Sequence, residues 1–237
     1  MYRFTWKDDN VRKVSIVMAV YNERESIEKV LEKIQKVDVG LEKEIVIVDG
    51  RSTDGTREIL KNIRDDRIKV IFEDEKRGKG AALRTGFKSA TGDIILIQDA
   101  DLEIDPFEYP GLLEPILKNE SDIVYGSRFS RGRGRTSAVT YFGNRLMTIA
   151  ANILFNVRLT DIETCYKVFK AECLGGLEFS CNGFDFDAEL TAAFLRNKRK
   201  ILEIPISYNP RNKKDGKKLH WTAGLSSMRA LIRGRFR

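Results

Sequence analysis

Apolar and polar positions follow two alternating patterns along the first half of the chain. Short continuous apolar runs, typical of strands buried on both faces, predict strands at residues 14–20, 44–48, 68–72, 93–98 and 122–125. Between these runs, apolar residues recur every three or four positions, which predicts helices at residues 26–36, 80–90 and 106–118 and another after Asp54. Strands that alternate with helices in this way predict an α/β fold, with a mostly parallel central sheet and helices on both faces.

The second half of the chain is less regular. Helical spacing runs through residues 141–155 and 186–195, and strand-like stretches cover residues 165–169 and 201–207. No linker, composition break or internal repeat separates the two halves. We therefore expect one domain over residues 1–210, followed by a basic amphipathic C-terminal segment over residues 211–237.

One apolar run, at residues 94–97, ends in three acidic side chains at alternate positions, namely Asp99, Asp101 and Glu103. Residues two apart on an extended chain point to the same side, so these carboxylates can converge. Converging carboxylates repel one another unless a cation lies between them, and oxygen ligands of this kind suit Mg²⁺ or Mn²⁺ together with substrate phosphates. The alternative is an acidic loop that caps the helix beginning near Pro106.

Polar residues also follow the other predicted strands. Tyr21, Asn22 and Glu23 come directly after the first strand, and Asp49 ends the second. In parallel sheets covered by helices, ligands bind outside the carboxyl ends of the strands. We therefore expect these residues to share one site with Asp99 and its neighbours.

Composition narrows the class of protein. The 237 residues are 42% hydrophobic and 32% charged, as in folded globular proteins. No apolar run reaches the length of a membrane span, and the polar first ten residues do not resemble a secretory signal. The three cysteines, an odd number without metal-type spacing, argue against a disulfide framework and favour a reduced, cytoplasmic setting.

Positive charge is concentrated at the C-terminus. Residues 211–237 carry nine Lys or Arg and one Asp, whereas the whole chain has a net charge of +7. Nucleic acid and anionic lipid are both candidate partners for such a segment, but no recognised nucleic-acid-binding motif accompanies it.

Apolar residues recur at helical spacing next to Trp221, namely Leu225, Met228, Leu231 and Ile232. A basic amphipathic helix of this kind can lie on an anionic bilayer, which predicts peripheral attachment to a membrane surface; the alternative is a helix packed on the domain with a solvated basic face.

Seven segments, taken in order, resemble the family 2 glycosyltransferases of the GT-A fold. Among these the chain most resembles the polyprenyl-phosphate sugar synthases, such as the dolichyl-phosphate mannose and glucose synthases. The segments are residues 20–23, 47–56, 77–82, 99–101, 126–129, 159–167 and 204–208. Two positions depart from the family pattern, because Ala19 stands where Pro is usual and Gly50 where a second Asp is frequent.

The resemblance implies roles for individual residues. Those expected in the site are Tyr21, Glu23 and Asp49 on the nucleotide, Lys79 beside it, Arg128 and Arg145 on phosphate groups, and Asp161 and Asp187 near the donor sugar or the acceptor. Asp99 and Asp101, with Glu103, would hold the Mg²⁺ or Mn²⁺ that bridges the diphosphate, and we expect Asp99, Asp101 and Arg128 to be catalytic. Four of these positions also have a structural alternative: packing for Tyr21, a turn for Asp49, a solvated basic turn for Lys79 and helix capping for Asp187.

The resemblance also implies an activity. A hexose would pass, with inversion, from a UDP- or GDP-sugar to a polyprenyl (dolichyl or undecaprenyl) phosphate at the cytoplasmic face of a membrane. A phosphate monoester has a second pKa of about 6 and needs no strong general base, whereas a sugar hydroxyl acceptor would need a carboxylate such as Asp161, Asp185 or Asp187. Two other hypotheses remain. The chain could be a family 2 glycosyltransferase that acts on a sugar hydroxyl, or a non-catalytic protein that binds a sugar nucleotide. A sugar-nucleotide pyrophosphorylase would instead carry a Gly-rich signature after the first strand.

Overall fold

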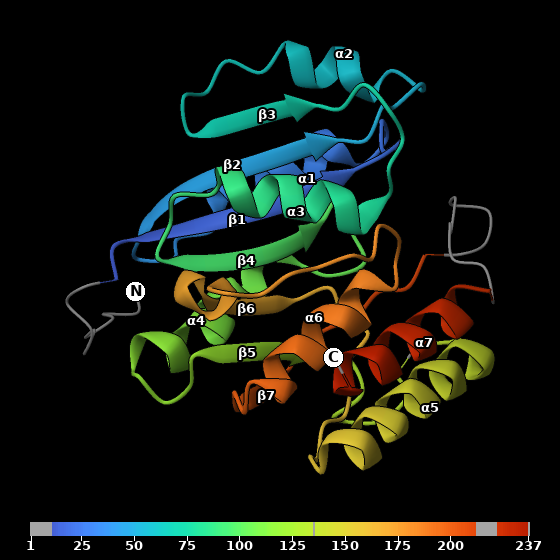
Figure 1. The fold of residues 1–237 in the computed structure, drawn as a ribbon. Helices are drawn as coiled ribbons and strands as arrows, with labels where there is room; N and C mark the ends of the chain where they lie inside the picture. Colours follow the sequence, from blue (N-terminus) through green and yellow to red (C-terminus); the bar gives the residue numbers. More distant parts are fainter. Residues whose placement is uncertain (1–10, 135, 212–221, 237) are drawn as a thin grey trace.

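The computed structural model describes residues 11–134, 136–211 and 222–236, and this part of the chain forms one seven-stranded sheet (Figure 1). The strand order is β3-β2-β1-β4-β6-β5-β7. The strands are β1 (Lys13–Val20), β2 (Glu42–Asp49), β3 (Ile68–Phe72), β4 (Ile94–Asp99), β5 (Ile123–Ser127), β6 (Lys167–Lys170) and β7 (Ile201–Pro205).

The sheet is mostly parallel, as the strand and helix pattern predicted. β1 pairs in parallel with β2 and β4, β2 with β3, and β5 with β7. β6 is the exception, because it runs antiparallel between β4 and β5. The carboxyl ends of β1, β2, β4 and β5 therefore meet at one edge of the sheet, and the chain enters β6 at that same edge.

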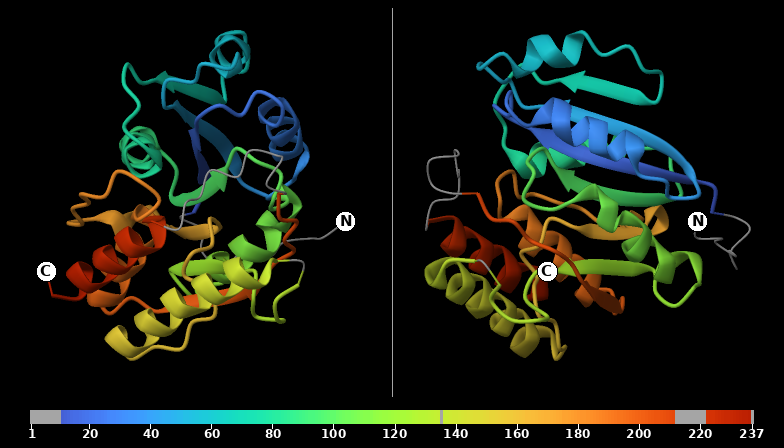
Figure 2. Two further views of the ribbon diagram at one scale, coloured as in Figure 1. Left: turned by 90° about the vertical axis from the view of Figure 1, so that its right-hand side faces the viewer. Right: turned by 180° about the vertical axis from the view of Figure 1, so that it is seen from behind.

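Helices cover both faces of the sheet (Figures 1 and 2). α1 (Ile27–Lys36), α2 (Thr56–Lys61) and α4 (Tyr109–Leu117) share one buried apolar cluster. α3 (Lys79–Ser89), α5 (Ala138–Phe155), α6 (Phe186–Arg196) and α7 (Thr222–Phe236) contribute to the cluster on the opposite face. Successive β1 residues alternate between the two, since Ile16 and Met18 belong to the first cluster and Val17 to the second.

Local sequence explains most of the helix boundaries. The spacing that predicted α1 is observed, because Ile27, Val30, Leu31 and Ile34 are all buried. Gly55 occupies the N-cap position of α2, and the predicted capping residue Asp54, one position earlier, accepts a hydrogen bond from the amide of Thr56 at 3.0 Å. α2 ends at Lys61, before Ile63, and Pro106 begins a short 3-10 turn (η1, Pro106–Glu108) ahead of α4.

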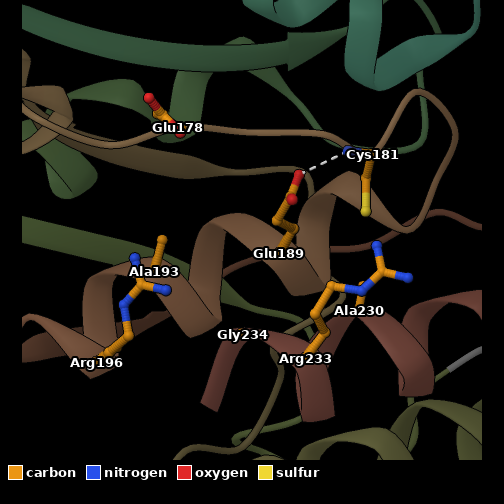
Figure 3. A pocket seen from close by; sticks show the side chains of 8 residues that line it. All are labelled: Glu178, Cys181, Glu189, Ala193, Arg196, Ala230, Arg233 and Gly234. Atoms are coloured by element: carbon orange, nitrogen blue, oxygen red, sulfur yellow. Dashed lines mark hydrogen bonds between the residues drawn. The ribbon is translucent and has the colours of Figure 1, made fainter. Parts of the chain in front are cut away.

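α7 packs closely against α6. Its buried residues are Ser227, Ala230, Leu231 and Gly234, and a Cβ added at Gly234 would lie 2.5 Å from the Cβ of Ala192. A cavity of only about 10 Å³ remains between the two helices, beside the hydrogen bond from the Cys181 amide to Glu189 (Figure 3). Glycine is therefore required at this close approach of two backbones.

The apolar residues of the C-terminal helix do not share one environment. Leu231 is fully buried in the core, whereas Leu225 and Ile232 are 65% and 44% exposed. The helix has two apolar sides because one of them packs on α6. Trp221, His220 and the four lysines at 213, 214, 217 and 218 lie outside the described residues.

No helix in the described ranges is long and apolar enough to span a bilayer.

Candidate active site

The predicted site residues gather at the edge where the parallel strands end. Val20 at the end of β1 is paired with Asp49 of β2, and Ala19 is paired with Asp99 of β4. Arg128 follows β5, and the loop that leads from α5 into β6 brings Asp161 to the same edge. The expected common location at the carboxyl ends of the strands is observed.

The acidic residues after β4 lie beside cations. Asp99 forms an ion pair with Lys79 at 2.8 Å. The Nε of Arg211 lies 4.0 Å from a carboxylate oxygen of Asp101. Burial, together with the charges of Asp99 and Glu103, raises the pKa of Asp101 to about 7. Within the described residues, no three His, Cys, Asp or Glu side chains are arranged to hold a metal ion.

The chemistry of these carboxylates nevertheless fits a divalent cation. Asp101 is destabilised as an anion by its two acidic neighbours, and a bound cation would remove that repulsion. Asp99, Asp101 and Glu103 therefore stay the predicted ligands of Mg²⁺ or Mn²⁺.

Lys79 bridges two elements of the site. Its Nζ lies 2.8 Å from Asp99, the last residue of β4, and 3.4 Å from Asp187 on α6. Burial would lower the pKa of Lys79, but Asp187 and Asp99 outweigh burial and hold it well above its usual value. The side chain is 12% exposed, so Lys79 is an internal counter-ion and not the solvated turn residue of the alternative interpretation.

The glycines around Lys79 have a packing role. Gly78 has a φ of +104°, and a Cβ there would lie 2.4 Å from the carbonyl oxygen of Asn182. The amide of Gly80 donates to that same oxygen at 2.8 Å. The first amides of α3 are thus used by the chain segment before α6, which explains the Gly-Lys-Gly sequence without a phosphate.

Asp187 forms a second ion pair, with Lys167, in addition to the one with Lys79. Lys167, fully buried at the start of β6, donates to the Oδ1 of Asp187 at 2.7 Å and also to the carbonyl oxygen of Thr164. Burial would raise the pKa of Asp187, but Lys167 and Lys79 together lower it. The chain of charges Lys167–Asp187–Lys79–Asp99 therefore ties α6 and β6 to the end of β4.

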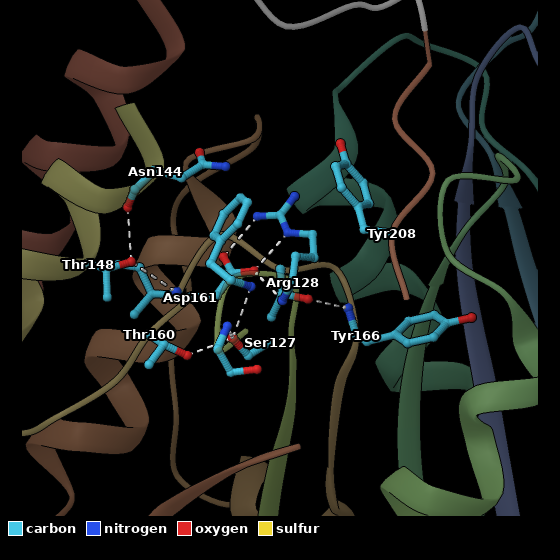
Figure 4. Close-up of polar contacts among 12 residues, drawn as sticks. Ser127, Arg128, Asn144, Thr148, Thr160, Asp161, Tyr166 and Tyr208 are labelled. Carbon is cyan, nitrogen blue, oxygen red and sulfur yellow. Dashed lines mark hydrogen bonds and ion pairs between the residues drawn. The ribbon is translucent and has the colours of Figure 1, made fainter. Parts of the chain in front are cut away.

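Arg128 is held in a fixed orientation by Asp161 (Figure 4). Its Nε and Nη2 reach the two carboxylate oxygens at 2.7 and 2.8 Å, and its backbone amide donates to the same group at 3.0 Å. Burial would lower the pKa of Arg128, but Asp161 raises it. The guanidinium also lies 5.2 Å from the ring centre of Tyr208. A two-fold contact of this kind presents a rigid cation to the site.

The Asp161 loop is itself anchored by Glu203 of β7. The carboxylate of Glu203 accepts from the amides of Thr160 and Asp161 at 2.7 and 2.9 Å. Arg145 of α5 donates to the carbonyl oxygen of Thr160 at 3.3 Å. Arg128 and Arg145, both predicted to hold phosphate groups, are therefore brought to the same loop.

The segment after β7 crosses the acidic residues. Tyr208 donates to one carboxylate oxygen of Glu103 at 3.1 Å, and the amide of Arg211 donates to the other at 2.8 Å. The guanidinium of Arg211 contacts the carboxylate of Glu23 at 2.8 Å. Sequence analysis counted Arg211 with the basic segment, whereas the structure places it between the predicted nucleotide and metal residues.

The predicted nucleotide residues have protein partners. The ammonium group of Lys76 lies 4.1 Å from the ring centre of Tyr21. Asp49 is fully buried, accepts from the amide of Ser52 and lies 3.3 Å from Arg57. These contacts agree with the turn interpretation of Asp49, and its contact with a nucleotide stays a prediction.

Sequence analysis missed three residues that build the site. Gln98 is buried at the end of β4, where its Oε1 accepts from Tyr109 and Tyr166 at 2.6 and 2.7 Å. Lys167 and Glu203 supply the counter-charges described above. The signal was present for all three, because each is a polar residue within an otherwise apolar strand. Arg131 and Arg133, by contrast, are exposed in the loop after β5, and Arg135 lies outside the described residues.

A mixed, mostly parallel sheet with acidic residues at the end of β4 is the architecture of nucleotide-diphospho-sugar transferases of the GT-A type. Glucosyl-3-phosphoglycerate synthase from Mycobacterium tuberculosis, solved with Mn²⁺, UDP and glucosyl-3-phosphoglycerate, has this fold with a TM-score of 0.73. The likeness covers 95% of this chain and 80% of that one at 21% identity. The same enzyme solved with Mg²⁺ and UDP gives a TM-score of 0.73 at 20% identity, over 95% and 80% of the two chains.

Residues 15–175 match the family model of glycosyl transferase family 2, and the chain belongs to this family of glycosyltransferase enzymes. It is 32% identical over 213 residues to a dolichol-phosphate mannosyltransferase from Pyrococcus furiosus, covering 86% of this chain and 59% of that protein. It is 27% identical over 208 residues to an undecaprenyl-phosphate mannosyltransferase from Micrococcus luteus, covering 83% of each. A hexosyltransferase of low-salt glycan biosynthesis from Haloferax volcanii is 28% identical over 84% of this chain, which spans 48% of that protein. The chain thus spans about half the length of some of its relatives.

Proposed function

We propose that this chain transfers a hexose, with inversion, from a nucleotide-diphospho-sugar to a polyprenyl phosphate. An oxygen of the lipid phosphate forms the new bond to the anomeric carbon, while the bond from that carbon to the diphosphate breaks and a nucleoside diphosphate leaves. Two similar proteins are named for dolichol phosphate and undecaprenyl phosphate, which supports a polyprenyl phosphate of either kind as the acceptor.

The observation that carries this proposal is the pairing of the carboxylates. Both oxygens of Asp161 are bonded to Arg128, and the two oxygens of Asp187 contact Lys167 and Lys79. Asp185 accepts a hydrogen bond from the amide of Gly183 at 3.1 Å. Asp161 and Asp187 are therefore poorly suited to take a proton from a hydroxyl, whereas an anionic phosphate acceptor needs no such base.

The basic residues have a matching role. Arg128, oriented by Asp161, and Arg145 would bind the phosphate groups of donor and acceptor. Asp99, Asp101 and Glu103 would hold Mg²⁺ or Mn²⁺, which when bound stabilises the negative charge on the departing diphosphate. The structural relatives solved with Mn²⁺ or Mg²⁺ and UDP support this assignment.

A donor panel tests the activity. Radiolabelled UDP- and GDP-sugars are incubated with the enzyme, a short polyprenyl phosphate and Mn²⁺, and the label is followed into the organic phase. We expect one or a few donors to yield labelled lipid. Calorimetry should show tighter binding of that sugar nucleotide when Mn²⁺ is present. Binding without transfer would favour a non-catalytic sugar-nucleotide-binding protein, and transfer to a free sugar hydroxyl would favour the rival acceptor.

We also propose that the enzyme works at the cytoplasmic face of a membrane. α5 and α7 lie side by side in the fold (Figures 1 and 2), and these two helices would face the bilayer. α5 exposes an apolar stripe at a spacing of three and four residues, made of Val139, Phe142, Leu146, Ile149 and Ile153. Beside it, Leu225, Met228 and Ile232 line a groove of about 410 Å³ with Arg229 and Arg233. Exposed apolar side chains bordered by arginines fit an anionic bilayer.

Replacing Leu146 and Ile153 together by glutamine should lower binding to anionic vesicles at least about thirtyfold, because each apolar side chain buried in a bilayer contributes about 1–2 kcal/mol. Flotation with acidic and neutral vesicles measures this. Phe107→Gln is the matched control, since Phe107 is 58% exposed but lies on η1, away from the stripe. Equal partition of the double variant and the control would contradict the assignment of this face.

A further inference from the structure

Glu163 is a carboxylate beside the predicted site residues that makes no hydrogen bond to any residue in the described ranges. It lies in the loop between α5 and β6, two residues after Asp161. Its Oε1 is buried without a partner, and neither of its oxygens bonds to a described residue. A buried polar atom without a partner is costly, and in native proteins it usually indicates a role in function.

Glu163 differs in this respect from Asp99, Asp161 and Asp187. Asp99 is paired with Lys79, Asp161 with Arg128, and Asp187 with two lysines. Lys167 and Arg128 act on Glu163 only through their charge, without contact at hydrogen-bond distance. The cations that pair with these three carboxylates form no hydrogen bond or ion pair with Glu163, which is therefore available to a substrate.

The chemistry of the substrates identifies which group that is. The donor diphosphate and the lipid phosphate are anions whose oxygens accept hydrogen bonds, so both would repel an acidic side chain. The hydroxyl groups of the hexose are neutral and can donate. A carboxylate oxygen without a donor, in a site built for two anions, is therefore complemented by the sugar.

Resting on the proposed function, we infer that Glu163 accepts a hydrogen bond from a hydroxyl of the donor hexose and helps to determine which sugar is transferred. Burial and the nearby Asp187 raise the pKa of Glu163 to about 7. The side chain therefore gains from a hydroxyl donor that stabilises its ionised form. Glu163 would recognise the sugar, whereas Arg128 and Arg145 would bind the phosphate groups.

Glu163→Gln and Glu163→Ala test this inference by calorimetry. The ligands are the sugar nucleotide that the wild type transfers and the corresponding nucleoside diphosphate without sugar, each with Mn²⁺. We expect the affinity for the sugar nucleotide to fall about 10- to 100-fold in both variants, as for other hydrogen bonds to charged groups. The affinity for the nucleoside diphosphate should remain within about twofold.

Deoxy analogues of the donor locate the contact. The wild type should bind one deoxy sugar nucleotide as weakly as the Glu163 variants bind the parent, and those variants should lose nothing further with that analogue. Glu114→Gln is the matched control, because Glu114 lies on the surface of α4 and pairs with Lys118 at 2.6 Å. Its affinities should equal those of the wild type.

Three outcomes would overturn the inference. Equal losses for sugar nucleotide and nucleoside diphosphate would make Glu163 a structural residue. A loss of kcat with unchanged donor affinity would make it a general base for a hydroxyl acceptor. Wild-type affinities in both variants would exclude any contact with the sugar. Failure of the wild type to bind any sugar nucleotide would instead refute the proposed function itself.

Discussion

Replacing Asp101 by asparagine is expected to lower sugar transfer at least about a thousandfold while the fold stays intact. Asparagine has the same shape but no charge, so it is a poorer ligand for the cation that would stabilise the departing diphosphate. Chelation of divalent cations should lower wild-type transfer to a similar level and leave the variant almost unchanged. Initial rates of labelled lipid formation, with and without chelator, measure both effects.

Asp105→Asn provides the matched control for this experiment. Asp105 lies four residues further along the same loop, pairs with Lys33 at 2.9 Å and caps η1 through the amide of Phe107. Asparagine retains the cap, so transfer should remain near the wild-type rate. Retention of transfer by Asp101→Asn, with Mn²⁺ still tightening the binding of the sugar nucleotide, would exclude Asp101 as a metal ligand.

The Asp101→Asn substitution should stabilise the protein in the absence of metal. Burial and the charges of Asp99 and Glu103 raise the pKa of Asp101 to about 7 in the folded state, above its value in the unfolded chain. The ionised group therefore opposes folding progressively as the pH rises from about 4 to 7. Asp101→Asn removes this cost, and urea unfolding at pH 7.5 should show a gain of about 1 kcal/mol. A gain in stability with a loss of activity is typical of residues selected for function.

Much of the fold could be predicted because it depends on local patterns. The continuous apolar run at 94–97 and the helical spacing of Ile27, Val30 and Ile34 each record burial directly in the sequence. The antiparallel direction of β6 could not be read, since it depends on where the chain returns after α5. The split of α7 into two apolar sides was also hidden, because Leu231 and Ile232 are equally apolar and only packing on α6 separates them.

The candidate site shows a similar division. Alternation along the chain indicated that Asp99 and Asp101 belong together, but it could not reveal the lysine of another element that pairs with Asp99. Counter-ions are chosen by distance in three dimensions, and residues 79, 167 and 187 come together only when α3, β6 and α6 are packed. A charged residue within an apolar strand, such as Lys167 or Glu203, is the available sequence signal for such a network, although it does not name the partner.

Replacing Lys167 by methionine is expected to destabilise the fold by about 3–5 kcal/mol. Lys167 is fully buried, and its ammonium group lies 2.7 Å from Asp187. Methionine fills a similar volume but leaves Asp187 with only the more distant Lys79 at 3.4 Å, and removal of one partner from a buried ion pair is among the most costly substitutions. Urea unfolding followed by circular dichroism measures the loss.

Two further variants separate the ion pair from other causes. Lys170→Met changes the other lysine of β6, whose contact with Asp122 at 3.7 Å is partly exposed, and should cost less than about 1 kcal/mol. The double variant Lys167→Met with Asp187→Leu removes both charges and should recover most of the stability lost by the single substitution. A double variant no more stable than Lys167→Met alone would show that the loss arises from packing and not from an unpaired carboxylate.

The pH dependence of unfolding provides an independent test of the same pair. Burial alone would raise the pKa of Asp187, but Lys167 and Lys79 lower it below the value of the unfolded chain. Asp187 therefore contributes stability above the unfolded pKa of about 4, and this contribution is lost as the pH falls through the lower folded value. In Lys167→Met the burial of Asp187 is opposed by one lysine only, so its folded pKa rises. The variant should accordingly lose less stability than the wild type between pH 5 and about pH 2, and the two unfolding curves should converge toward acid. Parallel curves would mean that Lys167 does not control the ionisation of Asp187, and the charge network from β6 to Asp99 would have to be abandoned.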